Sequence, residues 1–261
     1  MEENKTKIIA VAGKGGVGKT SIAANMVRIL TKAHPDKKIL AIDADPAVGL
    51  STALGIKVET TIDDIRKEVV ASAEDGDKKA AIELLQDARF RIFDALVETE
   101  GFSFIAVGRP EAAGCYCKIN SYLKEVISIL AENFDYVVID GEAGIEQINR
   151  RVMEKVTHLV LVTDSSKKGC DVIGTIKKVA DELVMYEKVG VIANRIPSDK
   201  GVISEEIKNA MNIGELKALA YIPSDAKLAE FDLKGENVFF LPEESLVVCG
   251  VSKALQELEL V

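Results

Sequence analysis

Apolar, β-branched runs recur along the chain, and most of them are separated by segments with helical spacing. Several runs are almost continuously apolar, which is typical of strands that are covered on both faces of a sheet. The alternation predicts an α/β fold with a mostly parallel central sheet of about seven strands flanked by helices. The runs that we assign to strands are KIIAVAG (7–13), KILAIDAD (38–45), FSFIAVG (102–108), DYVVIDG (135–141), HLVLVTD (158–164), KVGVIAN (188–194) and LKALAYIP (216–223).

Helical periodicity follows the first run directly. The segment SIAANMVRILTKA carries an apolar stripe that consists of Ile22, Met26, Ile29 and Leu30. Residues 56–100 contain no clear strand and have the pattern of about two or three helices, so we interpret them as a helical insertion between the second and third strands. Their polar stretch 72–83 is typical of a helix–helix connection and not of a domain linker, because apolar periodicity resumes on both sides. We therefore expect residues 1–261 to form a single domain.

Composition and charge narrow the functional classes. The chain is 48% hydrophobic, but no apolar run reaches the roughly 18 residues that a membrane span needs. A net charge of −9 repels phosphate backbones, so we expect no nucleic-acid partner. The N-terminus MEENKTKIIAVAG lacks the charged and apolar regions of a signal peptide, which predicts a cytoplasmic protein.

A glycine-rich loop follows the first predicted strand and opens the first predicted helix. Its sequence GKGGVGKT (13–20) fits the phosphate-loop pattern G-x-x-x-x-G-K-[ST] in the context that this pattern requires. The glycines let backbone N–H groups turn toward phosphates, and the helix N-terminus adds partial positive charge. Lys19 is expected to reach the β- and γ-phosphates, and Thr20 to hold Mg²⁺. The nucleotide-binding residues predicted from this loop are Gly13, Gly15, Gly16, Val17, Gly18, Lys19, Thr20 and Ser21.

The same loop carries a second lysine. The string KGGVGKT resembles the deviant Walker A loop of the MinD/ParA/nitrogenase-iron-protein class of dimeric P-loop ATPases. In that family the first lysine crosses the dimer interface to the partner's nucleotide. Carried over to Lys14, the resemblance implies an ATP-sandwiched homodimer in which this catalytic cation stabilises negative charge on the phosphoryl oxygens. In a lone subunit Lys14 could simply be solvated.

Acidic residues end two of the predicted strands. Parallel sheets bind ligands at the carboxyl ends of their strands, and phosphoryl transfer to water needs groups that orient the nucleophile and hold Mg²⁺. AIDADPAVGL (41–50) resembles the first switch region of the same class, which implies that Asp45 positions the attacking water. Asp43 either helps around the Mg²⁺ or only caps the strand. DYVVIDGEAG (135–144) resembles the Walker B strand and second switch, which implies that Asp140 holds the Mg²⁺ shell.

The sequence favours adenine over guanine as the base. Guanine sites of GTPases usually show N-K-x-D, but Pro197 occupies the position of the aspartate after Asn194. Family members use an asparagine here for adenine, which implies Asn194. YIPSD (221–225) resembles the segment that lines the other side of the base, which implies Pro223. A structural role for Pro223 and Asp225, as a turn and a helix cap, explains this segment at least as well.

Two of the four cysteines, Cys115 and Cys117, lie in GCYCKIN (114–120). On an extended segment such a pair points the same way, while a disulfide between them would be strained. Two thiolates do not complete a soft-metal site, which usually takes about four ligands. A two-fold dimer would supply four. Four thiolates suit Zn²⁺ or an Fe–S cluster, and Ni²⁺ and Cu(I) are also compatible.

GCYCKINSYL (114–123) and DGEAGIEQ (140–147) together resemble the CooC/AcsF-type nickel-insertion ATPases, maturation factors for carbon monoxide dehydrogenase and acetyl-CoA synthase. In that family the paired cysteines bind metal at the dimer interface. The resemblance implies that Cys115 and Cys117 bind Ni²⁺, with Zn²⁺ as a competitor, and that the client is a nickel enzyme. We expect the remaining cysteines and both histidines to be structural, and the two cysteines to be buried: Cys170, Cys249, His34 and His158.

Two other functions are compatible with this class. An ATP-dependent reductase would carry a bridging Fe–S cluster, but the nitrogenase iron protein takes one cysteine from shortly after the second switch. Here no cysteine follows Asp140 until Cys170. A MinD/ParA-like positioning ATPase that binds membranes would end in a basic amphipathic helix, whereas this sequence ends in SKALQELELV. We therefore expect no membrane partner.

Overall fold

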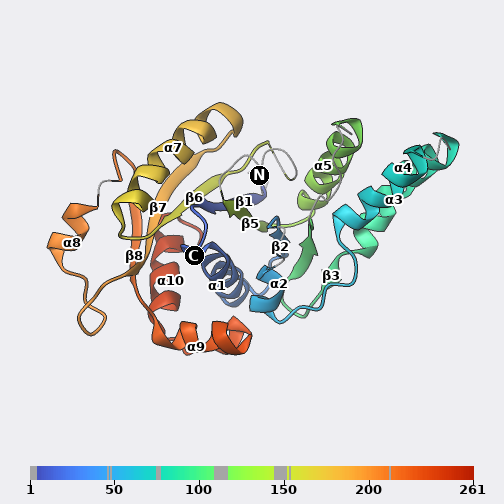
Figure 1. Cartoon of the computed structure of the whole chain (residues 1–261). Helices are drawn as coiled ribbons and strands as arrows, with labels where there is room; N and C mark the ends of the chain where they lie inside the picture. Colours follow the sequence, from blue (N-terminus) through green and yellow to red (C-terminus); the bar gives the residue numbers. More distant parts are fainter. Residues whose placement is uncertain are drawn as a thin grey trace.

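Eight strands form one sheet at the centre of the protein (Figure 1). The computed structural model describes residues 5–45, 47, 49–74, 78–108, 117–143, 152, 154–211 and 213–261. The strands are β1 (Lys7–Gly13), β2 (Ile39–Asp43), β3 (Val97–Glu98), β4 (Ser103–Ala106), β5 (Tyr136–Ala143), β6 (His158–Thr163), β7 (Lys188–Ile196) and β8 (Ala218–Pro223). Their order is β3-β4-β2-β5-β1-β6-β7-β8, and all neighbouring pairs are parallel except β3 with β4.

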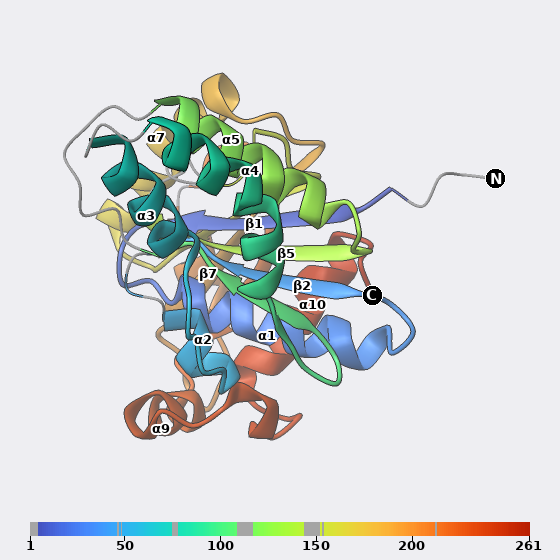
Figure 2. The same cartoon turned by 90° about the vertical axis from the view of Figure 1, so that its right-hand side faces the viewer.

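Helices cover both faces of this sheet. They are α1 (Lys19–Ala33), α2 (Gly49–Leu54), α3 (Ile62–Glu74), α4 (Lys78–Asp94), α5 (Cys117–Ala131), α7 (Lys167–Leu183), α8 (Glu205–Ala210), α9 (Ala226–Lys234), α10 (Leu246–Glu257) and the 3₁₀ helix η1 (Val238–Phe240). Figure 2 shows α3, α4, α5 and α7 on one side of the strands and α1, α2, α9 and α10 on the other. The layered α/β architecture is the predicted one.

The central strand β1 explains why the strand sequences are so apolar. Its residues Ile9 and Val11 join the core on the α1 side, whereas Ala10 and Ala12 join the core on the α5 side. All of them are fully buried. A strand with helices packed on both faces has no side that meets water, so its sequence loses the usual polar alternation.

The strand assignments are confirmed for all seven apolar runs, with one addition. Residues 56–100, in which we predicted no strand, contain β3, so that prediction was wrong. β3 pairs with β4 in antiparallel fashion at the edge of the sheet. It has only two residues, which is too short to show an alternation of apolar and polar positions in the sequence. The insertion otherwise contains α3 and α4, which extend into the polar stretch 72–83 from both sides.

The apolar residues of α10 belong to the core. This helix packs against α1 and β8, and its buried residues are Val247, Val248, Val251, Ala254 and Leu255. Its apolar face is therefore used inside the fold and is not free to enter a lipid surface.

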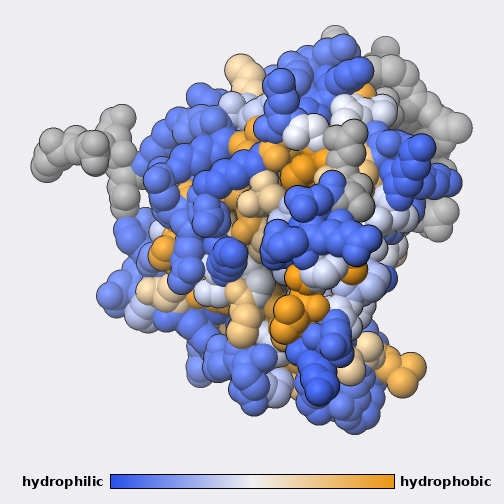
Figure 3. All heavy atoms as spheres, turned by 90° about the vertical axis from the view of Figure 1, so that its left-hand side faces the viewer, coloured by the Kyte–Doolittle hydropathy of each residue, from blue (hydrophilic) through white to orange (hydrophobic). Residues whose placement is uncertain are grey.

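Hydrophilic residues cover much of the face on which α8 lies (Figure 3). Throughout the described ranges, no helix combines the length and apolarity needed to cross a membrane.

Candidate nucleotide-binding site

The glycine-rich loop lies between the carboxyl end of β1 and the first turn of α1, as its sequence predicts. A Cβ atom on Gly13 would lie 2.2 Å from the carbonyl oxygen of Val162 on the neighbouring strand β6. Gly18, immediately before α1, has φ 91 in the left-handed region. Glycine is the residue that fits both positions without strain. The strand–loop–helix context that a phosphate loop needs is therefore present.

Lys19 lies almost buried in this loop, with 7% of its surface exposed. Its Nζ donates a hydrogen bond to the carbonyl oxygen of Lys14 at 3.2 Å, so the side chain folds back across the loop. Burial lowers the pKa of Lys19, and the carboxylates of Asp140, Asp45 and Glu142 oppose that shift in this order. The structure thus brings the predicted phosphate-binding cation close to the predicted acidic residues.

Asp43 and Asp140 are register partners on β2 and β5, and both are fully buried. Asp43 accepts hydrogen bonds from the backbone N–H of Asp45 at 3.1 Å and of Leu50 at 2.9 Å. Burial raises its pKa to about 6 in spite of these hydrogen bonds. Leu50 is in the first turn of α2, so Asp43 links the end of β2 to the start of that helix, whereas the predicted structural role was only a cap of the strand. Its role near Mg²⁺ stays a prediction.

Asp140 has a different environment. No donor within the described residues forms a hydrogen bond of normal geometry with either of its carboxylate oxygens. Burial raises its pKa to about 7, while the nearby Thr20 side chain lowers it in part. A buried carboxylate that has no hydrogen bond of normal geometry, next to a threonine hydroxyl of the phosphate loop, fits a hydrated Mg²⁺ as its missing partner.

Asp45 follows β2 on the same edge of the sheet. Its Oδ1 accepts a hydrogen bond from the backbone N–H of Ala47 at 2.8 Å, which shapes the turn that leads to α2. Its charge acts on Lys19, so it lies near the phosphate loop. Its predicted task, orientation of the attacking water, is compatible with this position and stays a prediction.

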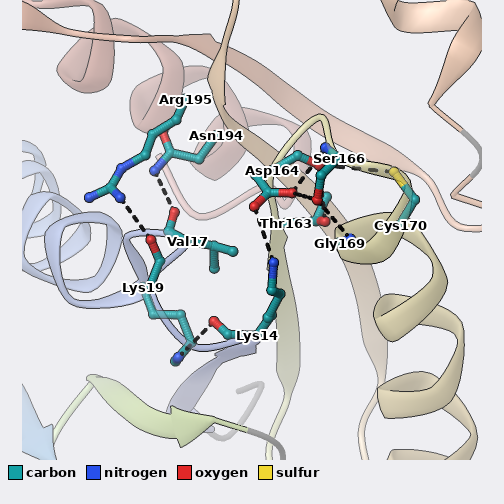
Figure 4. Close-up of polar contacts among 11 residues, drawn as sticks. Lys14, Val17, Lys19, Thr163, Asp164, Ser166, Gly169, Cys170, Asn194 and Arg195 are labelled. Carbon is teal, nitrogen blue, oxygen red and sulfur yellow. Dashed lines mark hydrogen bonds and ion pairs between the residues drawn. The ribbon is translucent and has the colours of Figure 1, made fainter.

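Lys14 forms an ion pair within its own chain. Its Nζ lies 3.6 Å from Oδ2 of Asp164, which follows β6 (Figure 4). The side chain of Lys14 remains 30% exposed. Asp164 is held in turn by the backbone N–H of Ser166 at 3.0 Å and by the Ser166 hydroxyl. In the single chain Lys14 is therefore paired, which is neither the solvated state nor the predicted contact with a partner.

Asn194 and Arg195 reach the phosphate loop from the end of β7. The Asn194 side chain is nearly buried and donates to the carbonyl oxygen of Val17 at 2.9 Å, while Arg195 donates to that of Gly16 at 2.7 Å. Contact between Asn194 and adenine stays a prediction. We did not foresee Arg195. A cation directly after the strand-end asparagine was the available signal.

Pro223 ends β8, and Asp225 caps the next helix. The carboxylate of Asp225 accepts hydrogen bonds from the backbone N–H groups of Lys227 and Leu228 in α9 and of Val247 in α10. The structural alternative for Asp225 is confirmed. The contact of Pro223 with a base stays a prediction.

The cysteine motif falls largely outside the described residues. Cys115 lies outside them, and Cys117 is described only as the first residue of α5. Cys117 therefore belongs to a helix and not to the extended segment that we predicted. Cys170 is buried, as expected, but Cys249 is exposed, which corrects that prediction. The apolar sequence of α10 does not reveal which of its faces meets the core.

Both histidines have structural contacts. The His34 ring stacks on Tyr136 with centroids 4.9 Å apart, and its Nε2 lies 2.7 Å from the carbonyl oxygen of Leu260. His158 is buried beside Thr157, and burial lowers its pKa to about 4. In the part of the chain that the structure describes, no three His, Cys, Asp or Glu side chains are grouped so that they could hold a metal ion.

Comparisons with known proteins agree with this geometry. The family model CbiA, the CobQ/CobB/MinD/ParA nucleotide binding domain, matches residues 8–238. An uncharacterized ATP-binding protein of Methanocaldococcus jannaschii is 38% identical over 252 residues, which cover 96% of this chain and 98% of the relative. The carbon monoxide dehydrogenase accessory protein CooC of Rhodospirillum rubrum is 27% identical over 246 residues, which cover 89% of each.

A solved structure supports the fold assignment. The septum site-determining protein MinD of Pyrococcus horikoshii OT3, complexed with Mg-ADP, matches with a TM-score of 0.66. The match covers 97% of this chain and 96% of that chain, at 24% identity. At this identity the likeness carries the fold and not the function.

Proposed function

Because the chain belongs to the CobQ/CobB/MinD/ParA nucleotide-binding family and is a P-loop ATPase of the MinD/ParA class, we propose that it acts as a dimeric nickel-delivery ATPase. In this proposal two copies bind Ni²⁺ between their C-x-C motifs. ATP binding and hydrolysis then control transfer of the ion to a client nickel enzyme, such as carbon monoxide dehydrogenase or acetyl-CoA synthase. The likeness to a carbon monoxide dehydrogenase accessory protein supports this choice of client.

The observation that carries the proposal is the start of α5 at Cys117. This helix connects β4 to β5, which both run parallel to β2 in the same sheet. A helix between parallel strands begins at their carboxyl edge and returns to their amino edge. The phosphate loop opens α1 at that same carboxyl edge. Cys117 and the nucleotide site therefore share one edge, where an ATP-dependent partner can act on both.

Ligand number supports a dimer. The motif supplies two thiolates from one chain. A second copy related by a two-fold axis would bring the number to about four, which suits a soft metal ion. Zn²⁺ competes well for such a site. The cargo ion is thus held only when two chains are in register.

Lys14 is suited to report on the partner. Its ion pair with Asp164 is long, at 3.6 Å, and both side chains are partly exposed. Exposed ion pairs contribute little free energy, so this contact can be exchanged for a stronger one with phosphate oxygens. In the proposed dimer Lys14 leaves Asp164 and contacts the nucleotide of the partner subunit.

The remaining site residues would divide the work on ATP. Lys19 and the loop amides would bind the phosphates, Asn194 and Pro223 would contact the adenine, and Asp45 would orient the attacking water. Thr20 and Asp140, with Asp43 beside them, would hold Mg²⁺, which neutralises charge on the β- and γ-phosphates. The buried carboxylate of Asp140 supports this assignment, because neither of its oxygens has a hydrogen bond of normal geometry among the described residues and the Thr20 side chain lies beside it.

ATP can drive metal transfer only if two dimer states bind the ion with different affinities. We propose that the ATP state aligns the two C-x-C motifs and that hydrolysis changes the distance between their thiolates. Asp140 connects the nucleotide site to the second switch, because it lies in β5 and is the first residue of the switch segment DGEAG (140–144). Loss of the γ-phosphate would then change the structure at the edge of the sheet where the metal is held.

Removal of the thiolates tests the metal site. Cys115→Ala with Cys117→Ala should abolish nickel retention, measured by elemental analysis after gel filtration, and should leave ATP binding intact. Cys249→Ala is the matched control, because Cys249 is exposed and lies in α10. Stoichiometric nickel in the double variant would contradict the proposed site.

Two further variants test the dimer. Lys14→Ala should weaken ATP-dependent dimerisation, and Asp45→Ala should trap the ATP-bound dimer because hydrolysis stops. Sedimentation velocity with and without ATP measures both effects, and Lys32→Ala, at the far end of α1, is the control. A chain that stays monomeric with ATP and Ni²⁺ would contradict the shared metal site but not the ATPase activity.

The same preparations separate the proposal from its alternatives. A reductase with a bridging Fe–S cluster would contain iron and absorb visible light when purified without oxygen. A membrane-positioning ATPase would sediment with liposomes in the presence of ATP. For a nickel-delivery ATPase we expect nickel without iron, no liposome binding, and ATP-dependent activation of the client enzyme.

A further inference from the structure

Two consecutive residues at the end of β7 hold two consecutive carbonyl groups of the phosphate loop. Nδ2 of Asn194 donates to the oxygen of Val17 at 2.9 Å, and Nη1 of Arg195 donates to the oxygen of Gly16 at 2.7 Å (Figure 4). A loop that binds phosphates through inward N–H groups must direct its carbonyl groups away from the ligand. Both carbonyls already have donors in the nucleotide-free chain.

A local irregularity of β7 aims both side chains at the loop. Successive residues of a regular strand point to opposite faces, so a regular strand would offer only one of this pair. The pairing of β7 with β8 shifts register between Ala193 and Ile196. Between them Arg195 has φ 55, in the left-handed region that a residue with a side chain rarely adopts. Bulges of this kind occur beside active sites and re-aim a side chain.

We infer that Arg195 is a positioning residue for the phosphate loop and that the bulge at residues 194–195 serves to aim it. The guanidinium holds the carbonyl of Gly16 outward, which keeps the loop amides directed at the phosphates before ATP arrives. A loop that is ordered in advance binds its ligand without the entropic cost of ordering. This inference depends on nucleotide binding and not on metal delivery.

The surroundings of the pair fit this role. A Cβ atom on Gly18 would lie 2.5 Å from Nδ2 of Asn194, so the side chain of Asn194 fills the space that a larger loop residue would need. Burial raises the pKa of Asp232 in α9, and the charge of Arg195 opposes this shift, so Arg195 also lies near an acidic group of α9. The guanidinium thus donates to a loop carbonyl and also interacts electrostatically with a carboxylate of α9.

Three variants test the inference. Arg195→Gly keeps the left-handed backbone at no cost and removes the donor, whereas Arg195→Lys keeps a cationic donor. Lys200→Gly is the matched control, because Lys200 is another exposed cation with a left-handed backbone, φ 48, in the turn between Asp199 and Val202. The measurements are the Kd for ATP, the KM and kcat of hydrolysis, and the melting temperature of the nucleotide-free protein.

We expect Arg195→Gly to weaken ATP binding about tenfold and to raise KM by a similar factor, with kcat changed less than about twofold. Arg195→Lys should recover binding to within about threefold of the parent, and Lys200→Gly should bind like the parent. The melting temperature should not change. Parent-like ATP binding by Arg195→Gly, failure of lysine to recover it, or a loss that follows a lowered melting temperature would each overturn the inference.

Discussion

Asp43 and Asp140 are the same residue type at the same level of two adjacent strands, yet they have opposite environments. Both are fully buried, and they are paired in register. Asp43 accepts backbone N–H groups of Asp45 and Leu50, whereas no described donor forms a hydrogen bond of normal geometry with Asp140, beside which only the Thr20 side chain lowers the pKa as a donor. The burial of a carboxylate therefore does not distinguish a structural role from a ligand-binding one. The number of donors around it does, because a buried charge without donors needs a partner from outside the chain.

The largest expected effect comes from removing the carboxylate that lacks donors. Asp140→Ala should lower Mg²⁺-dependent ATP hydrolysis by about 100-fold or more, because the metal loses the protein group that holds it in place. Phosphate release at saturating ATP and Mg²⁺ measures the loss. Asp36→Ala, which removes an exposed aspartate, is the control. Hydrolysis within about threefold of the parent rate would show that Asp140 does not serve the metal.

The opposite result is expected for stability. Asp43→Ala should lower the free energy of unfolding of the metal-free protein by about 2–4 kcal/mol, because it leaves the buried N–H group of Leu50 and the partly buried N–H group of Asp45 without acceptors. Urea unfolding in the presence of EDTA measures this difference. Asp140→Ala under the same conditions should cost clearly less. Equal losses in the two variants would remove the contrast between the two carboxylates.

Asp140→Asn should stabilise the metal-free protein by about 1–2 kcal/mol at pH 8. Burial raises the folded-state pKa of Asp140 to about 7, above its ordinary value of 3.8. The folded state therefore binds more protons than the unfolded state between these values, and this group's contribution to stability falls as the pH rises through that window. Urea unfolding from pH 4 to pH 8 should show a weaker fall in the variant. A parent-like pH dependence would contradict the assignment.

The smallest expected effect concerns the neighbour of Asp140. The Thr20 side chain lowers the pKa of Asp140, so Thr20→Val should move the midpoint of that pH dependence to slightly higher pH. Carbon-13 NMR of the aspartate carboxyl groups measures the shift directly, and Thr31→Val is the control on the same helix. The signal of Asp43 should not move, because its donors are backbone groups. Equal shifts at both carboxylates would point to a general change in the loop.

The fold and the phosphate loop follow from the sequence because their signals are local. Strands covered on both faces form continuous apolar runs, and the loop pattern requires only its own residues between a strand and a helix. The sequence did not predict β3, because a strand of two residues cannot show a hydrophobic period. The sequence did not predict the exposure of Cys249, because the flanking residues of α10 are apolar on more than one face.

The hydrogen-bonding environments of Asp43 and Asp140 cannot be predicted from local sequence patterns. The backbone N–H of Leu50 donates to Asp43 across a turn that the sequence does not specify. Capping and metal binding by Asp43 therefore remained equal alternatives. The aim of Arg195 depends on a register shift against β8, a strand that comes later in the chain. Such features arise from pairing in three dimensions, and propensity or motif spacing does not encode them.

The place of β1 in the sheet also sets the order of assembly. Its residue Ile9 pairs with Val138 on one side and with His158 on the other. β1 therefore cannot complete its pairing until residues from the middle of the chain are in place. Contacts between residues so far apart along the chain form late, because the loops that they close are entropically costly. The phosphate loop is attached to this strand and cannot take its shape earlier. Recovery of ATP binding during refolding should therefore coincide with completion of the central sheet, which makes the nucleotide a probe of the final folding step.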